Sequence, residues 1–235
     1  MCGRFTLHID LHEILGLLPG LVAGVWPGPR YNIAPTQMIA TIPNLLTENG
    51  AHALTFMRWG LIPAWAKDHK IAARLINARA ETLHEKPAFR APFTRRRCLV
   101  PADGFYEWAA MPGQKPKQPI YIRMKSGKPF VFAGLWERWD DPAGTGDTLT
   151  TCTLITTTPN ETIAPYHDRM PVILPPSAYD AWLAPGAQPL DRLRALLRPY
   201  AAAEMEAYPV SRRVNRPDAD DPACITPLDT QLPLL

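Results

Sequence analysis

The hydrophobic pattern of this chain is broken into many short segments. The strongest β pattern comprises 120–124 and 130–135, which flank Ser126 and Gly127, and we expect these two segments to form a hairpin. Apolar residues alternate with polar ones, or run together, in four further segments, 3–7, 38–42, 51–59 and 149–156. Apolar runs of this length predict strands that are buried on one or both faces.

Three other segments carry apolar residues at helical spacing. The apolar faces comprise Leu11, Ile14, Leu15 and Leu18 in the first, 178–183 in the second, and Leu190, Leu193, Leu196 and Leu197 in the third. Asp10 precedes the first and Ser177 the second, and both residue types favour the N-cap position. Because there is neither a repeat nor a regular alternation of strand and helix, the pattern predicts one α+β domain with a curved, mostly antiparallel sheet core.

Proline is the unusual feature of the composition, with 27 residues in 235. The prolines are spread along the whole chain, which excludes long helical bundles and coiled coils. Hydrophobic residues make up 46%, enough for a sizeable core. No apolar run approaches the ~18 residues of a membrane span, and the first residues do not resemble a signal peptide. We therefore expect no contact with a membrane and a location in the cytoplasm.

The net charge of +3 is too small to indicate a nucleic-acid partner, but its distribution is uneven. Between Arg74 and Arg97 there are seven Lys and Arg residues and only two acids, Glu81 and Glu85. Such a segment is either a solvated face or a surface that binds anions.

The cysteines and histidines give no metal or disulfide pattern. Cys2, Cys98, Cys152 and Cys224 are far apart in sequence, with no Cys-x-x-Cys pair. Cys98 and Cys152 lie in apolar segments, and we expect them to be buried. His8 and His12 have no third ligand at a suitable spacing. We predict no metal and no cofactor.

Cys2 follows Met1 directly and allows a specific chemistry. Removal of Met1 would place a free amine, with a pKa near 7.7–8.0, beside a thiol with a pKa near 8.5. Such a 1,2-aminothiol condenses with an aldehyde to an iminium, which the thiolate closes to a thiazolidine. The alternative is that Cys2 is an incidental small residue.

Polar residues within apolar segments favour the interpretation that Cys2 is reactive. Asn77 and Arg79 are two apart, so on an extended backbone they share a face. Glu107 lies within an aromatic strand, where burial would raise its pKa. His167 stands beside Arg169 just before an apolar segment. Each of these also has a structural reading, as a packed turn or a satisfied ion pair.

Seven motifs occur in a fixed order and together resemble one family. They are Met1-Cys2-Gly3-Arg4-Phe5, Tyr31-Asn32-Ile33-Ala34-Pro35, Arg58-Trp59-Gly60-Leu61-Ile62-Pro63-Ala64-Trp65, Ile76-Asn77-Ala78-Arg79-Ala80-Glu81-Thr82, Asp103-Gly104-Phe105-Tyr106-Glu107-Trp108, His167-Asp168-Arg169-Met170-Pro171 and Pro209-Val210-Ser211. The chain resembles the SOS-response-associated peptidases, which process abasic sites by crosslinking to DNA. The resemblance implies one barrel-like domain over 2–227, with 228–235 as a C-terminal tail. Its departures, the Pro/Gly-rich stretch 19–30 and the tail after Asn215, touch none of these motifs.

The resemblance also implies a role for individual residues. The catalytic residues would be Cys2 as the nucleophile, Asn77 as the amide that holds the N-terminal amine, Glu107 as the catalytic carboxylate and His167 as the residue facing the sugar. The DNA-binding residues would be Arg4, Arg79 and Arg169 on phosphates and Trp65 against unstacked bases.

The expected function is to bind single-stranded DNA, to crosslink Cys2 to the ring-opened aldehyde of an abasic site, and so to shield that site during the DNA damage response. An associated lyase activity and self-reversal follow from the imine intermediate. We expect a monomer that is associated with the nucleoid when it acts. Two alternatives stay open: a peptidase or amidase that uses the N-terminal Cys2 as nucleophile, and a DNA-binding module without catalysis.

Overall fold

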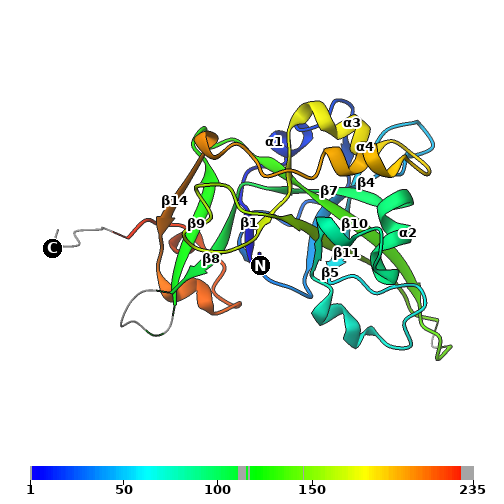
Figure 1. Cartoon of the computed structure of the whole chain (residues 1–235), viewed down its shortest axis with the longest axis horizontal. Coiled ribbons are helices and arrows are strands. Elements are labelled where there is room, and N and C mark those ends of the chain that lie inside the picture. Colours follow the sequence, from blue (N-terminus) through cyan, green and yellow to red (C-terminus); the bar gives the residue numbers. More distant parts are fainter. Residues whose placement is uncertain (1, 111–114, 116, 145, 229–235) are drawn as a thin grey trace.

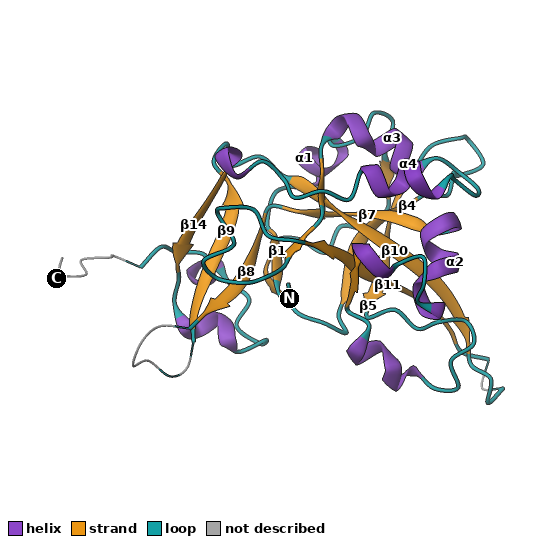
Figure 2. Cartoon of the chain, viewed as in Figure 1, coloured by secondary structure: helices purple, strands orange, loops and turns teal. Residues whose placement is uncertain are grey.

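The computed structural model describes residues 2–110, 115, 117–144 and 146–228. It contains two sheets, and Figures 1 and 2 show β1 near the centre of the molecule, where they meet. The smaller sheet has the order β14 (Met205–Pro209), β9 (Gln118–Met124), β8 (Gly104–Ala109), β1 (Phe5–Leu7) and β3 (Arg30–Ile33). All pairings in this sheet are antiparallel.

The larger sheet has nine strands and curves back on itself. Its main path is β12 (Met170–Pro171), β11 (Thr148–Thr157), β10 (Phe130–Asp140), β7 (Arg97–Ala102), β4 (Met38–Pro43), β5 (Ala53–Trp59) and β2 (Val22–Ala23). Off this path, β13 (Ile173–Leu174) pairs with β10 and β6 (Asn77–Arg79) with β11. A parallel pairing of β11 with β5 closes β11, β10, β7, β4 and β5 into a ring. The expected curved, barrel-like and mostly antiparallel core is confirmed.

The helices are short and lie around the sheets, with α2, α3 and α4 together at one end of the larger sheet (Figure 2). The α-helices are α1 (Leu11–Leu15), α2 (Pro87–Arg95), α3 (Tyr179–Leu183) and α4 (Leu190–Ala195). The 3-10 helices are η1 (His69–Arg74), η2 (Ala80–Thr82), η3 (Pro176–Ala178), η4 (Ala202–Glu204), η5 (Arg212–Asn215) and η6 (Pro222–Cys224). As far as the chain is described, every helix is too short or too polar to cross a bilayer.

The predicted first helix and its N-cap at Asp10 are confirmed, whereas the predicted N-cap of the second helix at Ser177 is wrong. Asp10 accepts a hydrogen bond from Glu13 N, while Glu13 reaches back to Asp10 N, which completes a capping box. Ser177, by contrast, lies inside η3, and its side chain makes no capping bond. Pro176 explains the difference, because a proline in the first turn starts the helical path one residue before Ser177.

The predicted hairpin of 120–124 and 130–135 is also wrong, although both strands exist. β9 pairs with β8 and β14, whereas β10 pairs with β7, β11 and β13. The turn at Gly127, with φ +69°, carries the chain from the smaller sheet to the larger one. The local pattern predicted the strands correctly but not their partners.

Candidate active site and nucleic-acid groove

Cys2 lies just before β1 and is fully buried. β1 pairs with β8 through Phe5 and Phe105, which brings the start of the chain beside the aromatic strand that carries Glu107. From the other side, Asn77 Nδ2 donates a hydrogen bond to the carbonyl oxygen of Cys2 at 2.8 Å. Residues from three separate motifs therefore meet at Cys2.

Asn77 holds this position because β6 pairs with β11 in parallel register. Its Oδ1 atom is buried and accepts no hydrogen bond from any residue that the structure describes. A buried amide oxygen without a donor is costly. Asn77 thus offers one acceptor beside the backbone of Cys2.

Glu107 is only 2% exposed, and burial raises the pKa of its carboxyl to about 7. The predicted direction of this shift is confirmed. Its immediate neighbour Tyr106 donates its backbone N–H to Arg4 O at 3.0 Å, which keeps β8 against the segment that contains Cys2. A carboxyl with a pKa near neutrality can both take and give protons.

Burial raises the pKa of the Cys2 thiol far above its ordinary value, and the nearby Glu107 carboxylate raises it further. The thiol is therefore protonated at neutral pH. This differs from the reference value used for the sequence, because a low-dielectric environment disfavours the thiolate. A reaction of this thiol requires a base, and Glu107 is close enough to influence its charge.

His167 lies in the turn before β12 and is half-buried. Its Nδ1 accepts the backbone N–H of Arg169 at 2.9 Å. Asp168 Oδ1 is at the same distance from Nδ1, but the Asp168 side chain is 85% exposed, so we assign Nδ1 to the fixed backbone donor. Nε2 then carries the proton of the neutral ring. Burial lowers the pKa of His167, which makes its protonated form a stronger acid.

The three predicted phosphate-binding arginines lie in different environments. Arg79 is exposed on β6. The Arg4 guanidinium donates to Asn32 Oδ1 at 2.7 Å and to Val214 O at 2.8 Å, and it lies over the Trp108 ring. Arg169 donates to both carboxylate oxygens of Glu81 at 2.8 Å. Arg79 is thus exposed to a ligand, while Arg4 and Arg169 are held by internal partners.

A groove of about 590 Å³ has Asn77 in its lining. Its lining comprises Trp65, Arg74, Leu75, Asn77, Arg79, Thr82, Lys86, Pro87, Ala88 and Phe89. Trp65 is 61% exposed, and a neighbouring hollow continues past it to Lys67 and Lys70. The groove combines positive charge with exposed aromatic surface, and its lining includes Asn77, which donates to the carbonyl oxygen of Cys2.

Only some of the Lys and Arg residues in the basic segment 74–97 line this groove. Arg74, Arg79 and Lys86 line the groove, and of these only Arg79 lies in one of the seven motifs. Arg97 is fully buried and donates to carbonyl oxygens, among them Trp182 O at 2.8 Å. Its guanidinium therefore binds backbone carbonyls in the core and adds no charge to the surface.

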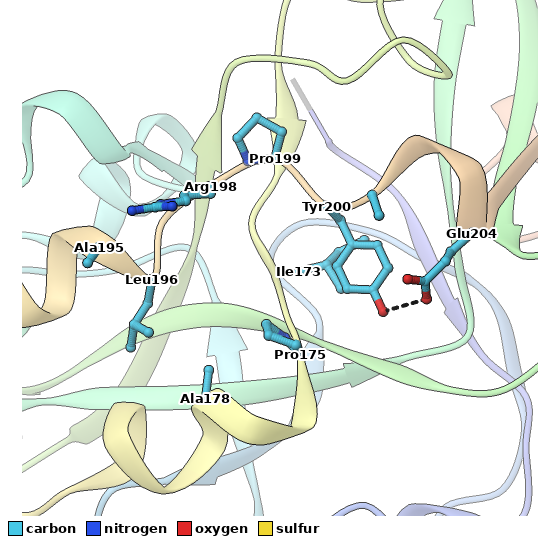
Figure 3. Close-up of a pocket in the computed structure, with 10 residues that line it drawn as sticks. Ile173, Pro175, Ala178, Ala195, Leu196, Arg198, Pro199, Tyr200 and Glu204 are labelled. Carbon is cyan, nitrogen blue, oxygen red and sulfur yellow. Dashed lines mark hydrogen bonds between the residues drawn. The ribbon is translucent and has the colours of Figure 1, made fainter.

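The other polar features lie away from the groove. In the described ranges no three His, Cys, Asp or Glu side chains gather around a possible metal position. Cys98 and Cys152 are buried as expected. The pocket in Figure 3, about 320 Å³, is lined by Ala178 of η3, by Ala195 of α4 and by the segment after it, where the Tyr200 hydroxyl donates to Glu204 at 3.1 Å. None of its lining residues belongs to the site around Cys2.

The model of one protein family, described as SOS response associated peptidase (SRAP), matches residues 1–217. This chain belongs to that family. The abasic site processing protein YoqW of Bacillus subtilis (strain 168) is 48% identical over 228 residues, which cover 96% of this chain and 99% of YoqW. The abasic site processing protein HMCES of Gallus gallus is 32% identical, covering 87% of this chain and 68% of HMCES.

The SRAP fold is also found among solved structures. A protein from Bacteroides thetaiotaomicron has a TM-score of 0.84 and 27% identity, covering 97% of this chain and 100% of the other. A phage-related protein from Bordetella bronchiseptica has a TM-score of 0.69 and 32% identity. The resemblance first seen in the seven motifs is confirmed over nearly the whole chain.

Proposed function

We propose that this protein binds single-stranded DNA in the groove and captures an abasic site as a thiazolidine on Cys2. The observation that carries the proposal is the bond to the carbonyl of Cys2 from Asn77, which lines a basic groove, near a carboxyl with a pKa of about 7. Relatives that bear the name of abasic site processing proteins support the same substrate.

The groove suits a single strand of any sequence. Arg74, Arg79 and Lys86 supply cations for phosphates, which do not differ between sequences. Trp65 presents an exposed indole, on which an unpaired base can stack. An abasic nucleotide beside Asn77 would then bring its sugar next to Cys2.

The first chemical step is the opening of the sugar. An abasic site is a cyclic hemiacetal in equilibrium with a small amount of open aldehyde. His167 in its protonated form gives a proton to the ring oxygen and the C1–O bond breaks, while the C1 hydroxyl loses its proton to water, which leaves the aldehyde and a new hydroxyl at the former ring oxygen. The lowered pKa of His167 makes that proton transfer more favourable.

The second step joins the aldehyde to Cys2. Once Met1 is removed, the α-amine of Cys2 adds to the aldehyde, and loss of water leaves an iminium. Asn77 Oδ1 orients the amine in this proposal, which is supported by its accepting no bond from the described residues. The thiol sulfur then attacks the iminium carbon while its proton passes to Glu107, so that one aldehyde and one aminothiol give a thiazolidine and one water.

The same iminium offers two other outcomes. Loss of a proton from the neighbouring carbon eliminates the 3′-phosphate, which is a lyase reaction. Return of the proton from Glu107 to sulfur reopens the ring, and hydrolysis then releases the aldehyde, which is self-reversal.

A denaturing gel tests the proposal. The full chain should form a slowly migrating adduct with single-stranded DNA that carries one abasic site and none with intact DNA of the same sequence. Cys2→Ala should abolish the stable adduct, whereas Cys98→Ala, which removes a buried thiol elsewhere, should retain it. An equally stable adduct from Cys2→Ala would contradict the thiazolidine. Cleavage of a peptide or amide without DNA, dependent on Cys2, would support a peptidase instead.

A further inference from the structure

A second hollow, of about 410 Å³, lies beside the site and is distinct from the groove that contains Trp65. Its lining comprises Ala80, Glu81, Thr157, Arg194 and Leu197. The segment 77–82 separates the two, because Asn77, Arg79 and Thr82 line the groove whereas Ala80 and Glu81 line this hollow. The two hollows therefore lie on either side of this segment.

Glu81 shields a guanidinium at this hollow. Its two oxygens accept from Arg169 Nη1 and Nη2, and Arg169 does not line the hollow itself. The Arg169 side chain is only 11% exposed, compared with 49% for Glu81. The carboxylate thus stands between the solvent and the guanidinium.

Arg169 keeps its place without Glu81. Its Nη2 also donates to Thr156 O at 2.7 Å, and Thr156 belongs to β11, in the closed ring of the larger sheet. Phosphate oxygens bind a guanidinium in the same two-point geometry as a carboxylate. Because Thr156 O still holds the guanidinium, a phosphate that replaces Glu81 gives Arg169 an anionic partner in place of the one it loses.

We infer that this hollow is a phosphate subsite for the DNA strand, in which Arg169 and Arg194 are the cations and Glu81 occupies the phosphate position until DNA binds. The inference rests on the proposed binding of single-stranded DNA. It assigns a DNA contact to Arg194, which is exposed on α4 and lies outside all seven motifs. Glu81 lowers the affinity for every strand, because each strand has to displace it.

The test measures the binding of intact, fluorescently labelled oligothymidylate by anisotropy at low and moderate salt, which needs no crosslink. Glu81→Gln should bind about twofold to fivefold more tightly at low salt. Arg194→Ala should bind more weakly and reduce the slope of log K against log salt by about 0.7, the value for one phosphate on a single strand. Adding Glu81→Gln to Arg169→Ala should give no further gain.

Two matched variants control for overall charge. Glu85→Gln removes an exposed carboxylate from the same segment, and Arg192→Ala removes an exposed guanidinium from α4; neither residue lines the hollow. Effects of Glu81→Gln and Arg194→Ala no larger than these would overturn the subsite, as would weaker binding by Glu81→Gln. If the wild-type protein does not bind the strand at all, both the subsite and the proposed function fail. If it binds but forms no adduct with abasic DNA, only the proposed chemistry fails.

Discussion

At the scale of single residues, Cys2 and Glu107 depend on each other. The buried thiol holds its proton at neutral pH, while the buried carboxyl of Glu107 has a pKa of about 7 and can remove it. Neither group would behave in this way on an exposed surface, because desolvation is the main cause of both shifts. In the proposed function, the protonated thiol of Cys2 is the nucleophile and Glu107 is the base that activates it.

The pKa of Glu107 also affects stability. Since the folded state raises this pKa from its ordinary value to about 7, the folded protein binds the proton more tightly than the unfolded chain. The wild-type protein should lose stability as the pH rises from about 4.5 to 7 and then level off. Glu107→Gln cannot titrate, so its stability relative to wild type should grow over this window by up to about 3 kcal/mol.

Urea unfolding at several pH values measures this difference. Glu48→Gln, at an exposed position, controls for the loss of one carboxylate. Parallel curves for Glu107→Gln and wild type would show that burial does not shift the Glu107 carboxyl.

Part of this chemistry could be predicted from the sequence. A carboxylate between aromatic residues already indicated a raised pKa for Glu107, because its burial follows from its own strand. The protonated thiol of Cys2 could not be predicted, since its burial depends on Asn77 and on β8, which are distant in sequence. The Glu81–Arg169 pair joins residues 88 apart for the same reason.

At the scale of elements, the loop that presents Trp65 is fixed to the larger sheet. Gly60 N donates to Cys152 O at 2.8 Å, and Trp139 Nε1 donates to Ala66 O at 2.8 Å. The chain can enter this loop only at a glycine, because Gly60 has φ +125° and a Cβ atom there would lie 2.7 Å from Ala72 O. A single backbone position therefore controls one wall of the groove.

Gly60→Ala should destabilise the protein by about 2–4 kcal/mol and weaken the binding of single-stranded DNA, because it displaces η1 and with it Trp65. Gly50→Ala is the matched control, since Gly50 has φ +73° but nothing within 4 Å of the added Cβ. It should cost about 1 kcal/mol and leave binding unchanged. Thermal unfolding and anisotropy measure the two effects; equal losses from both variants would show that the contact with Ala72 is unimportant.

Short-range patterns predicted the elements better than their partners. The strands at 120–124 and 130–135 exist, but each pairs elsewhere, because pairing is decided by which sheet buries which face. The start of the helix after Pro175 was wrong by a local effect of the second proline. In both cases the hydrophobic spacing predicted the right type of element. Strand pairing in the one case, and the second proline in the other, then decided the partners and the first residue of the helix.

At the scale of the whole molecule, Asn32 attaches the C-terminal part of the chain to the sheets. Its buried Nδ2 donates to Arg216 O at 2.9 Å and to Ala219 O at 2.6 Å, and its Oδ1 accepts from Arg4. Arg4 is two residues from Cys2, so the side-chain amide of Asn32 binds both the start and the end of the domain. The predicted boundary of the domain near 227 remains a prediction; Leu228 N still donates to Pro209 O, and the rest of the tail lies outside the described residues.

Asn32→Ala should release the segment 212–224 and cost about 2–4 kcal/mol, because it takes the side-chain donor from Arg216 O and Ala219 O and removes one of the two acceptors of the Arg4 guanidinium. Limited proteolysis should then cut within this segment, and crosslinking should slow. Asn44→Ala removes another buried amide, one that accepts from Arg97 N. It should destabilise the protein without making the segment 212–224 sensitive to protease; identical cleavage of both variants would contradict the role of Asn32.

The partners of the first strand also have a consequence during synthesis. β1 pairs with β8 at Phe105, and Cys2 is held by Asn77, so the start of the chain has no place in the fold until about 100 residues have been made. At roughly 5–20 residues per second, the N terminus stays accessible on the ribosome for about 5–20 s. An aminopeptidase can act on the N terminus in this interval, before folding buries Cys2. The order of translation thus leaves time to form the aminothiol that the proposed function requires.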